Sequence, residues 1–175
     1  MGDAGRVLIS TGEGKGKTTA ALGMVLRAYG HGIPVAVIQF VKSDKRTGEF
    51  AALQKMAGVE IFVTGLGFVP KPADPRFAEH KKAAEAGLRI AAEAARSGRY
   101  GLVVLDEVCT AVALTLLSEE AVLAVVHEAA PGCTLVLTGR GATPGLIAAA
   151  DTVSEIRSVK HGFDHGRKAQ KGVEF

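Results

Sequence analysis

Short apolar runs rich in β-branched residues alternate along the chain with longer, alanine-rich segments whose apolar positions recur at helical spacing. Apolar runs of this length, bounded by glycine, proline and polar residues, are typical of strands buried on both faces. Their alternation with helical segments predicts βα units around a mainly parallel sheet. We expect six strands, over residues 6–10, 35–40, 60–64, 102–106, 134–138 and 153–157.

The helices expected between these strands carry signals at their ends. Residues 18–29 and 76–96 form two of them, and the apolar stripe of the second should pack on the sheet. Ser118, which two glutamates follow, is expected to cap the start of another helix. Thr143 and Pro144 are expected to be the N-cap and the first residue of a further helix.

The composition fits one globular domain and excludes several classes of protein. A chain of 175 residues that is 47% hydrophobic and 22% charged can bury a full core. Its apolar runs are too short to span a membrane and its N-terminus lacks a signal-peptide layout, so we expect a cytoplasmic protein with no membrane partner. The net charge of +3 gives no reason to expect a nucleic-acid partner. Cys109 and Cys133 lack metal-ligand spacing and are expected to be buried thiols.

The strongest chemical signal is an apolar strand that runs into a glycine loop ending in Gly-Lys-Thr-Thr. Such a loop turns its backbone N–H groups inward, and the following helix adds its N-terminal dipole, so the loop can cradle a polyphosphate. Lys17 would bridge phosphate oxygens, and the Thr18 hydroxyl would bind a Mg²⁺ ion shared with them. Thr11 stands where the general pattern has its first glycine, so the match is incomplete. The residues expected to bind nucleotide here are Gly12, Glu13, Gly14, Lys15, Gly16, Lys17, Thr18 and Thr19.

A second signal is the pair Asp106 and Glu107 at the end of an apolar strand. Ligands of open parallel sheets bind at the carboxyl edge of the strands, where a carboxylate can hold Mg²⁺ opposite Thr18. The alternative is a strand that happens to end in acidic residues in solvent. The glycine loop upstream favours the functional interpretation, which makes Thr18, Asp106 and Glu107 the candidate metal ligands and Glu107 a candidate nucleotide contact.

Two arginines are further candidates for nucleotide contacts. Arg140 lies between two glycines after another apolar strand, where it can approach a phosphate closely. The alternative is a plain turn with an exposed arginine. Arg27, on the helix after the loop, could reach a ribose or phosphate, although spacing alone favours a solvated arginine.

Six segments carry a further signal when they are taken in order along the chain, namely residues 11–21, 39–42, 105–107, 138–141, 150–155 and 159–175. Together they resemble the P-loop type of ATP:corrinoid adenosyltransferase. The resemblance spans nearly the whole chain, and its last segment discriminates best, because generic P-loop kinases and NTPases lack this ending. Members of the family also carry threonine at the first loop position, so the incomplete motif supports the resemblance.

The resemblance implies an α/β fold of the P-loop NTPase-like (RecA-like) kind, a three-layer sandwich with a mainly parallel six-stranded sheet. Residues 1–175 would form a single P-loop domain, with residues 158–175 as a tail that covers the site. The implied reaction transfers the 5′-deoxyadenosyl group of ATP to the reduced cobalt(I) of a corrinoid and releases triphosphate. Lys17, Arg140, Mg²⁺ (or Mn²⁺) and the loop N–H groups would stabilise that leaving group, and no general base is required.

For the corrinoid, the resemblance implies bulky apolar residues beneath the ring, and Phe68 matches one of them. The second aromatic residue, commonly tryptophan, is Pro70 here. The chain starts a few residues before its first expected strand, so we expect it to lack the N-terminal helix that some members fold over the site. The family also implies a homodimer and a reducing flavoprotein as electron donor. The alternatives are a small P-loop phosphotransferase or ATPase, and a non-catalytic, nucleotide-dependent corrinoid-binding module.

Overall fold

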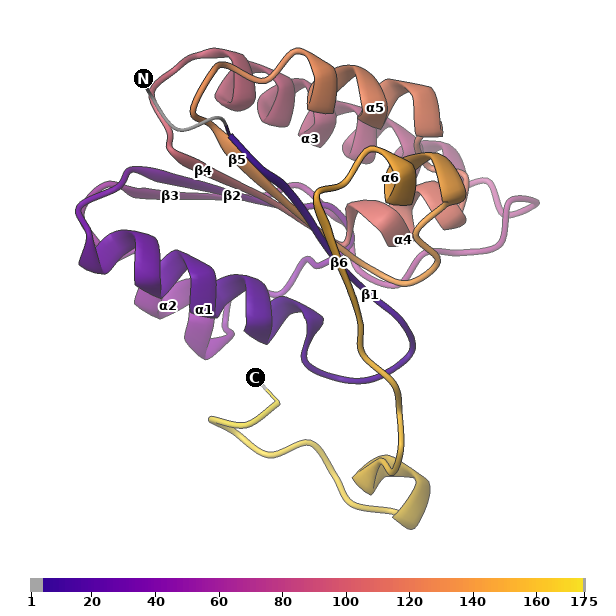
Figure 1. The fold of residues 1–175 in the computed structure, drawn as a ribbon. Coiled ribbons are helices and arrows are strands. Elements are labelled where there is room, and N and C mark those ends of the chain that lie inside the picture. Colours follow the sequence, from indigo (N-terminus) through magenta and orange to yellow (C-terminus); the bar gives the residue numbers. More distant parts are fainter. Residues whose placement is uncertain (1–4, 175) are drawn as a thin grey trace.

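The computed structural model describes residues 5–174 and forms a six-stranded sheet in which neighbouring strands run parallel, in the order β3-β2-β4-β5-β1-β6 (Figure 1). All six predicted strands are confirmed, and their bounds differ from the expected ones by no more than two residues. The strands are β1 (Val7–Thr11), β2 (Val35–Gln39), β3 (Val59–Val63), β4 (Leu102–Asp106), β5 (Thr134–Thr138) and β6 (Thr152–Glu155).

Helices cover both faces of the sheet, which confirms the expected three-layer α/β architecture. Figure 1 shows α1 and α2 below the sheet and α3, α4, α5 and α6 above it. A short 3₁₀ turn, Gly162–His165, lies in the tail that follows β6. The helices are α1 (Lys17–Gly30), α2 (Gly48–Leu53), α3 (Phe77–Arg96), α4 (Val108–Ala113), α5 (Glu119–His127) and α6 (Pro144–Ala148).

Successive residues of the central strands supply two hydrophobic cores, one on each face of the sheet. Val37 and Val104 pack with Val25 of α1 in the first core. Their neighbours Ile38 and Leu105 belong to the second core, which includes the alanines of α3. Side chains alternate between the faces of a strand, so a strand that is apolar throughout must be covered on both sides. This is why the central strands carry continuous apolar runs.

Two expected helix caps have different outcomes. The Ser118 hydroxyl accepts a hydrogen bond from the backbone N–H of Ala121 at 3.2 Å, which confirms the predicted N-cap of α5. Thr143 occupies the N-cap position of α6 and Pro144 its first turn, but the Thr143 side chain makes no capping hydrogen bond. Its hydroxyl donates to the carboxylate of Glu119 instead, because the start of α5 lies beside the start of α6.

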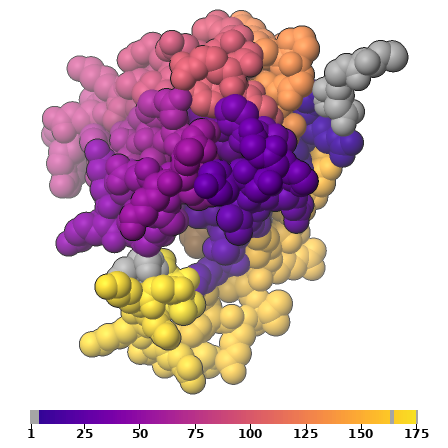
Figure 2. Space-filling model, turned by 90° about the vertical axis from the view of Figure 1, so that its left-hand side faces the viewer, coloured from indigo at the N-terminus to yellow at the C-terminus, as the bar shows by residue number. Residues whose placement is uncertain are grey.

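Both cysteines are buried and free, as predicted. Among residues 5–174, no helix has the length and apolar character that crossing a membrane requires. After β6 the chain leaves the body of the sheet and returns beneath the loop that connects β1 to α1, where the tail forms a yellow lobe (Figure 2). The carboxyl ends of the strands and this tail therefore lie on the same side of the molecule.

Candidate active site

The glycine loop joins β1 to α1 at the carboxyl edge of the sheet, as expected. Gly16 has a φ of 119°, a left-handed conformation that glycine adopts without a steric cost, and α1 starts at the next residue. Lys17 is only 7% exposed, and its ammonium donates to the carbonyl oxygens of Gly12 and Gly14 at 2.7 and 2.6 Å. Burial is the main reason that the pKa of Lys17 lies below its usual value, and the nearby Glu107 carboxylate opposes this shift. The lysine is thus held at the centre of the loop.

Two details of the loop differ from the simple cradle that the motif predicts. Thr11 belongs to β1, so the first loop position needs no glycine, and its hydroxyl accepts the N–H of Ala142 at 3.3 Å. The N–H of Gly14 donates to the carbonyl of Ile156 at 2.7 Å, so in this structure it does not point toward a ligand. A Cβ on Gly14 would lie 2.6 Å from the carbonyl oxygen of Arg157, so this glycine is required for packing against the chain after β6.

Asp106 is the hub of a buried polar network beneath the loop. It is 1% exposed, and its Oδ1 accepts from the hydroxyls of Thr18 at 2.9 Å and Thr138 at 2.7 Å. Its Oδ2 accepts from the side-chain amide of Gln39 at 3.1 Å and lies 3.0 Å from the ammonium of Lys42. A buried carboxylate is tolerated only when it is paired and hydrogen-bonded, and Asp106 is both. It positions Thr18 at the floor of the site.

Glu107 stands at the junction of β4 and α4 in the left-handed region, with a φ of 65°. This conformation costs a residue with a Cβ about 1–2 kcal/mol, so neighbouring contacts must hold it. Its N–H donates to the Thr138 hydroxyl at 2.9 Å, and its carboxylate accepts a short hydrogen bond from the Thr110 hydroxyl. Thr110 in turn accepts the backbone N–H of Arg140 at 2.9 Å. The strain places the Glu107 carboxylate in the site.

Arg140 follows β5 and lies across the loop from Glu13. Its Nε is 3.3 Å from the Glu13 carboxylate, and both side chains are mostly exposed. An ion pair of this kind contributes little to stability and is exchanged readily for another anion.

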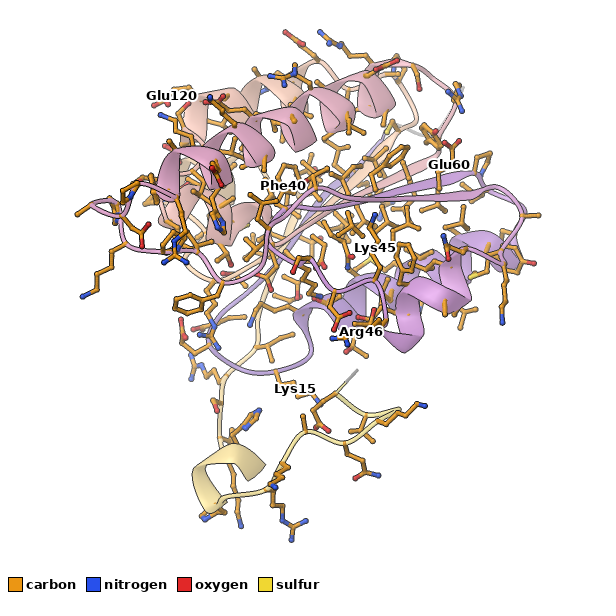
Figure 3. All side chains as sticks on the ribbon, turned by 180° about the vertical axis from the view of Figure 1, so that it is seen from behind. Lys15, Phe40, Lys45, Arg46, Glu60 and Glu120 are labelled. Carbon is orange, nitrogen blue, oxygen red and sulfur yellow. The ribbon has the colours of Figure 1, made fainter. Side chains whose placement is uncertain are left out.

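The tail that follows β6 contacts the glycine loop at Lys15. The Lys15 ammonium donates to the carbonyl of Val173 at 3.1 Å and to the carboxylate of Glu174 at 2.7 Å (Figure 3). Glu174 also accepts the backbone N–H of Gln170 at 2.7 Å. These two hydrogen bonds, the one from Lys15 first, lower the pKa of Glu174.

A cleft of about 780 Å³ opens above these groups. Most of the sequence-predicted site residues line it, namely Glu13, Gly14, Lys15, Gly16, Lys17, Thr18, Thr19, Glu107 and Arg140. Gly12 and Asp106 support it from below through their contacts with Lys17 and Thr18. Arg27 is not among the lining residues; it stands exposed in the last turn of α1, where its charge favours the helix dipole.

The cleft includes residues for which the sequence predicts no individual role. Lys42 follows β2, Thr110 lies on α4, and Gly172, Val173 and Glu174 come from the tail. His161 also lines the cleft, and for it the family resemblance implies polar contacts to the nucleotide or the corrinoid. Lys42 does belong to a segment that carries the family resemblance. Thr110 has no recognisable signal, because a threonine inside an apolar helix is common.

The donor groups fit a divalent cation that arrives with a ligand. Within residues 5–174, no three His, Cys, Asp or Glu side chains gather into a group that could hold a metal by themselves. Thr18 and Glu107, in contrast, present a hydroxyl and a carboxylate to the same cleft. Mg²⁺ usually takes one or two protein oxygens and completes its shell with water and phosphate oxygens. The chemistry of these residues suits Mg²⁺ bound to a polyphosphate.

Phe68 lies outside this cleft, on the loop after β3, and is 96% exposed. Together with Leu66 and Pro70 it lines a separate depression of about 840 Å³. The loop is tied to the cleft, because the N–H of Gly67 donates to the carbonyl of Val41, a residue of the cleft wall, at 2.9 Å.

Comparison with known proteins gives full-length matches. Residues 3–175 match the family model described as ATP:corrinoid adenosyltransferase BtuR/CobO/CobP. A corrinoid adenosyltransferase of Pseudomonas aeruginosa is 44% identical over 99% of this chain and 85% of its own. One from a Sinorhizobium species is 39% identical over 99% of this chain and 81% of its own. One from Escherichia coli K12 is 38% identical over 99% of this chain and 87% of its own.

Among solved structures, a KaiC-like protein from the archaeon Pyrococcus horikoshii matches with a TM-score of 0.56 and 17% identity. The match covers 90% of this chain and 74% of that chain. At this identity the likeness shows the fold alone, and that fold is the P-loop NTPase-like (RecA-like) arrangement expected from the sequence.

Proposed function

The chain belongs to the ATP:corrinoid adenosyltransferase family, and we propose that it transfers the 5′-deoxyadenosyl group of ATP to the cobalt(I) of a corrinoid, in biosynthesis or salvage of adenosylcobalamin. In this reaction a cobalt–carbon bond forms while the bond between C5′ and its oxygen breaks, and triphosphate leaves with the electron pair. The observation that carries the proposal is a full-length family match combined with a cleft in which several cations converge on the phosphate loop.

Lys17 and Arg140 would stabilise the triphosphate as negative charge develops on it. Lys17 already donates to two carbonyl oxygens of the loop. A phosphate oxygen is a stronger acceptor than a carbonyl oxygen, so the ammonium would exchange one for the other with a gain in energy. Arg140 would contribute a second cation across the loop. Both interactions strengthen as the bond to C5′ breaks, which is the condition for catalysis.

Thr18 and Glu107 would hold a Mg²⁺ or Mn²⁺ ion, with Asp106 orienting the Thr18 hydroxyl by the hydrogen bond at 2.9 Å. When bound, the ion supplies positive charge to the triphosphate. The strained backbone of Glu107 supports this role, because such strain is concentrated at functional sites.

Phe68 would lie beneath the corrin ring and take the place of the lower axial ligand. Its almost complete exposure supports this, because an exposed aromatic side chain next to Leu66 and Pro70 offers an apolar surface to a planar ligand. The hydrogen bond between Gly67 and Val41 would couple that surface to the nucleotide cleft.

The family resemblance also supports a homodimer, a cytoplasmic location and a reducing flavoprotein as electron donor. Sedimentation of the purified chain would test the first of these. A single species at the mass of one chain would contradict it.

The test of the function mixes the protein with ATP, Mg²⁺ and a chemically reduced corrinoid, and follows the cobalt spectrum and the phosphate products. We expect a cobalt–carbon bond and an equal amount of triphosphate. ADP formation that does not depend on the corrinoid would instead identify a phosphotransferase or ATPase.

Lys17→Ala tests the role of the loop in the same assay. It should abolish transfer, because it removes the cation at the centre of the loop. Lys45→Ala removes an equal charge from an exposed position outside the cleft lining and should transfer at the normal rate (Figure 3). Unchanged turnover in Lys17→Ala would refute the assignment of the loop.

A further inference from the structure

The ammonium group of Lys42 contacts both Thr18 and Asp106 at the floor of the cleft. Its Nζ donates to the Thr18 hydroxyl at 2.8 Å and lies 3.0 Å from Oδ2 of Asp106. The Thr18 hydroxyl donates its own proton to Oδ1 of Asp106. Lys42 follows β2, Thr18 lies on α1 and Asp106 ends β4, and two hydrogen bonds and one ion pair join the three side chains in a closed triangle.

The backbone holds Lys42 in this position. The N–H of Phe40, two residues before Lys42, donates to the carbonyl of Asp106 at 3.0 Å. On the other side, a Cβ on Gly65 would lie 2.3 Å from the carbonyl carbon of Val41, so the two segments are in close contact. The backbone of Lys42 is therefore fixed, and only its long side chain can move within the site.

This arrangement gives Lys42 the same ligands that a divalent cation would use. A hydroxyl offers one proton and two lone pairs, and Thr18 gives its proton to Asp106 and accepts the Lys42 ammonium. A metal ion on Thr18 would need a lone pair directed at the cleft and would lie close to the lysine charge. Like charges at such a distance repel strongly in a partly buried site.

We propose that Lys42 makes divalent-cation binding depend on the nucleotide. The inference rests on the proposed Mg²⁺ site at Thr18 and Glu107. The ammonium neutralises the buried Asp106 and repels a free cation, so the protein alone binds Mg²⁺ or Mn²⁺ poorly. A triphosphate brings enough negative charge to take both cations, and Lys42, whose side chain is 32% exposed, can turn from Thr18 toward the phosphates. Lys42 is thus a determinant of the order in which metal and nucleotide bind.

The test titrates Mn²⁺ alone into the protein and follows the signal of free Mn²⁺ by electron paramagnetic resonance. Lys42→Gln keeps a hydrogen-bond donor but removes the charge, and it should bind Mn²⁺ at least tenfold more tightly than the unmodified protein. Lys45→Gln removes the same charge from an exposed position three residues away and should match the unmodified protein. Lys42→Arg, which keeps the charge, should also bind Mn²⁺ weakly.

The same titration with ATP present, in which ultrafiltration separates protein-bound Mn²⁺ from the complex of Mn²⁺ with free ATP, distinguishes the two possible failures. Tight binding with ATP, but equal weak binding of Mn²⁺ alone to Lys42→Gln and the unmodified protein, would overturn the role of Lys42 and leave the metal site standing. No Mn²⁺ bound by the protein even with ATP would refute the metal site and the inference together. If Lys42→Gln fails to give the circular dichroism spectrum of the unmodified protein, Lys42→Met repeats the comparison with the same expected and contrary outcomes.

Discussion

Replacing Thr138 with valine should destabilise the protein well beyond the usual effect of an isosteric change. Thr138 is fully buried, and its hydroxyl forms hydrogen bonds with both Asp106 and Glu107, the two acidic residues at the end of β4. It donates to Asp106 Oδ1 at 2.7 Å and accepts the N–H of Glu107 at 2.9 Å. Valine fills the same volume but can do neither.

The magnitude follows from these two contacts. A hydrogen bond to a charged group contributes about 1.5–3 kcal/mol, and a buried N–H left without an acceptor costs about 1–3 kcal/mol. The two are not additive, because Asp106 keeps its contacts with Thr18, Gln39 and Lys42. We therefore expect the free energy of unfolding to fall by about 2–4 kcal/mol, or roughly 1 M or more in the urea midpoint.

The assay is urea denaturation with two matched controls. Thr134→Val makes the same change at the other end of β5, where the hydroxyl accepts a long hydrogen bond of 3.4 Å from the backbone N–H of Arg6, and should cost less than about 0.5 kcal/mol. Thr138→Ser keeps the hydroxyl and should recover most of the loss. Equal small losses in Thr138→Val and Thr134→Val would show that the network beneath the loop does not depend on Thr138.

Three further predictions concern other parts of the molecule. Phe68→Ala should leave the urea midpoint nearly unchanged, because the side chain is 96% exposed. The same substitution should slow transfer to cob(II)alamin more than transfer to an already reduced corrinoid. Equal slowing of the two reactions would show that Phe68 does not displace the lower axial ligand. The contact between Lys15 and Glu174 stabilises the docked tail at pH values above the ordinary pKa of a glutamate, and this stabilisation is lost as the pH falls through the lowered pKa of Glu174. The rate of amide hydrogen exchange in the tail, divided by the rate in the sheet, should therefore rise only in acid. A ratio of these two rates that does not change with pH would contradict this. Burial raises the pKa of Cys109 to about 12, with Glu107 adding to the shift, and burial also raises the pKa of Cys133. Iodoacetamide at pH 8 should therefore label both thiols slowly in the native protein and quickly in the unfolded protein. Fast labelling of the native protein would refute the burial of these thiols.

The sequence predicts the strands well because they are buried on both faces and therefore carry continuous β-branched runs. It does not predict α2 and α4, and the reason is their length. Each has six residues, which is too few for a helical period to emerge. In α4, Val-Cys-Thr-Ala-Val-Ala is nearly all apolar, because the helix packs directly on β5. Only the tertiary structure distinguishes such a segment from a strand.

The candidate site was predictable where one stretch of chain carries the chemistry, as in the loop from Gly12 to Thr19. Contacts between distant strands were not. Thr138 reaches Asp106 because β5 pairs directly with β4 on one side and β1 on the other, an order that the sequence does not state. Ile156 takes the N–H of Gly14 because β6 lies beside β1 and carries the chain past the loop. The strand order, rather than the motif, decides which loop N–H groups face the cleft.

The cations of the cleft fall into two groups by the oxygens that they contact. Lys15 and Arg140 pair with Glu174 and Glu13 in ion pairs that water reaches, and such pairs contribute little to stability, so almost any anion can displace them. Lys17 is buried on loop carbonyls and Lys42 contacts the buried Asp106, so moving either one costs more. A weakly charged anion can therefore engage only the outer pair. A ligand with the charge density of a triphosphate is needed to engage the inner pair, and this difference selects for it without any additional contact.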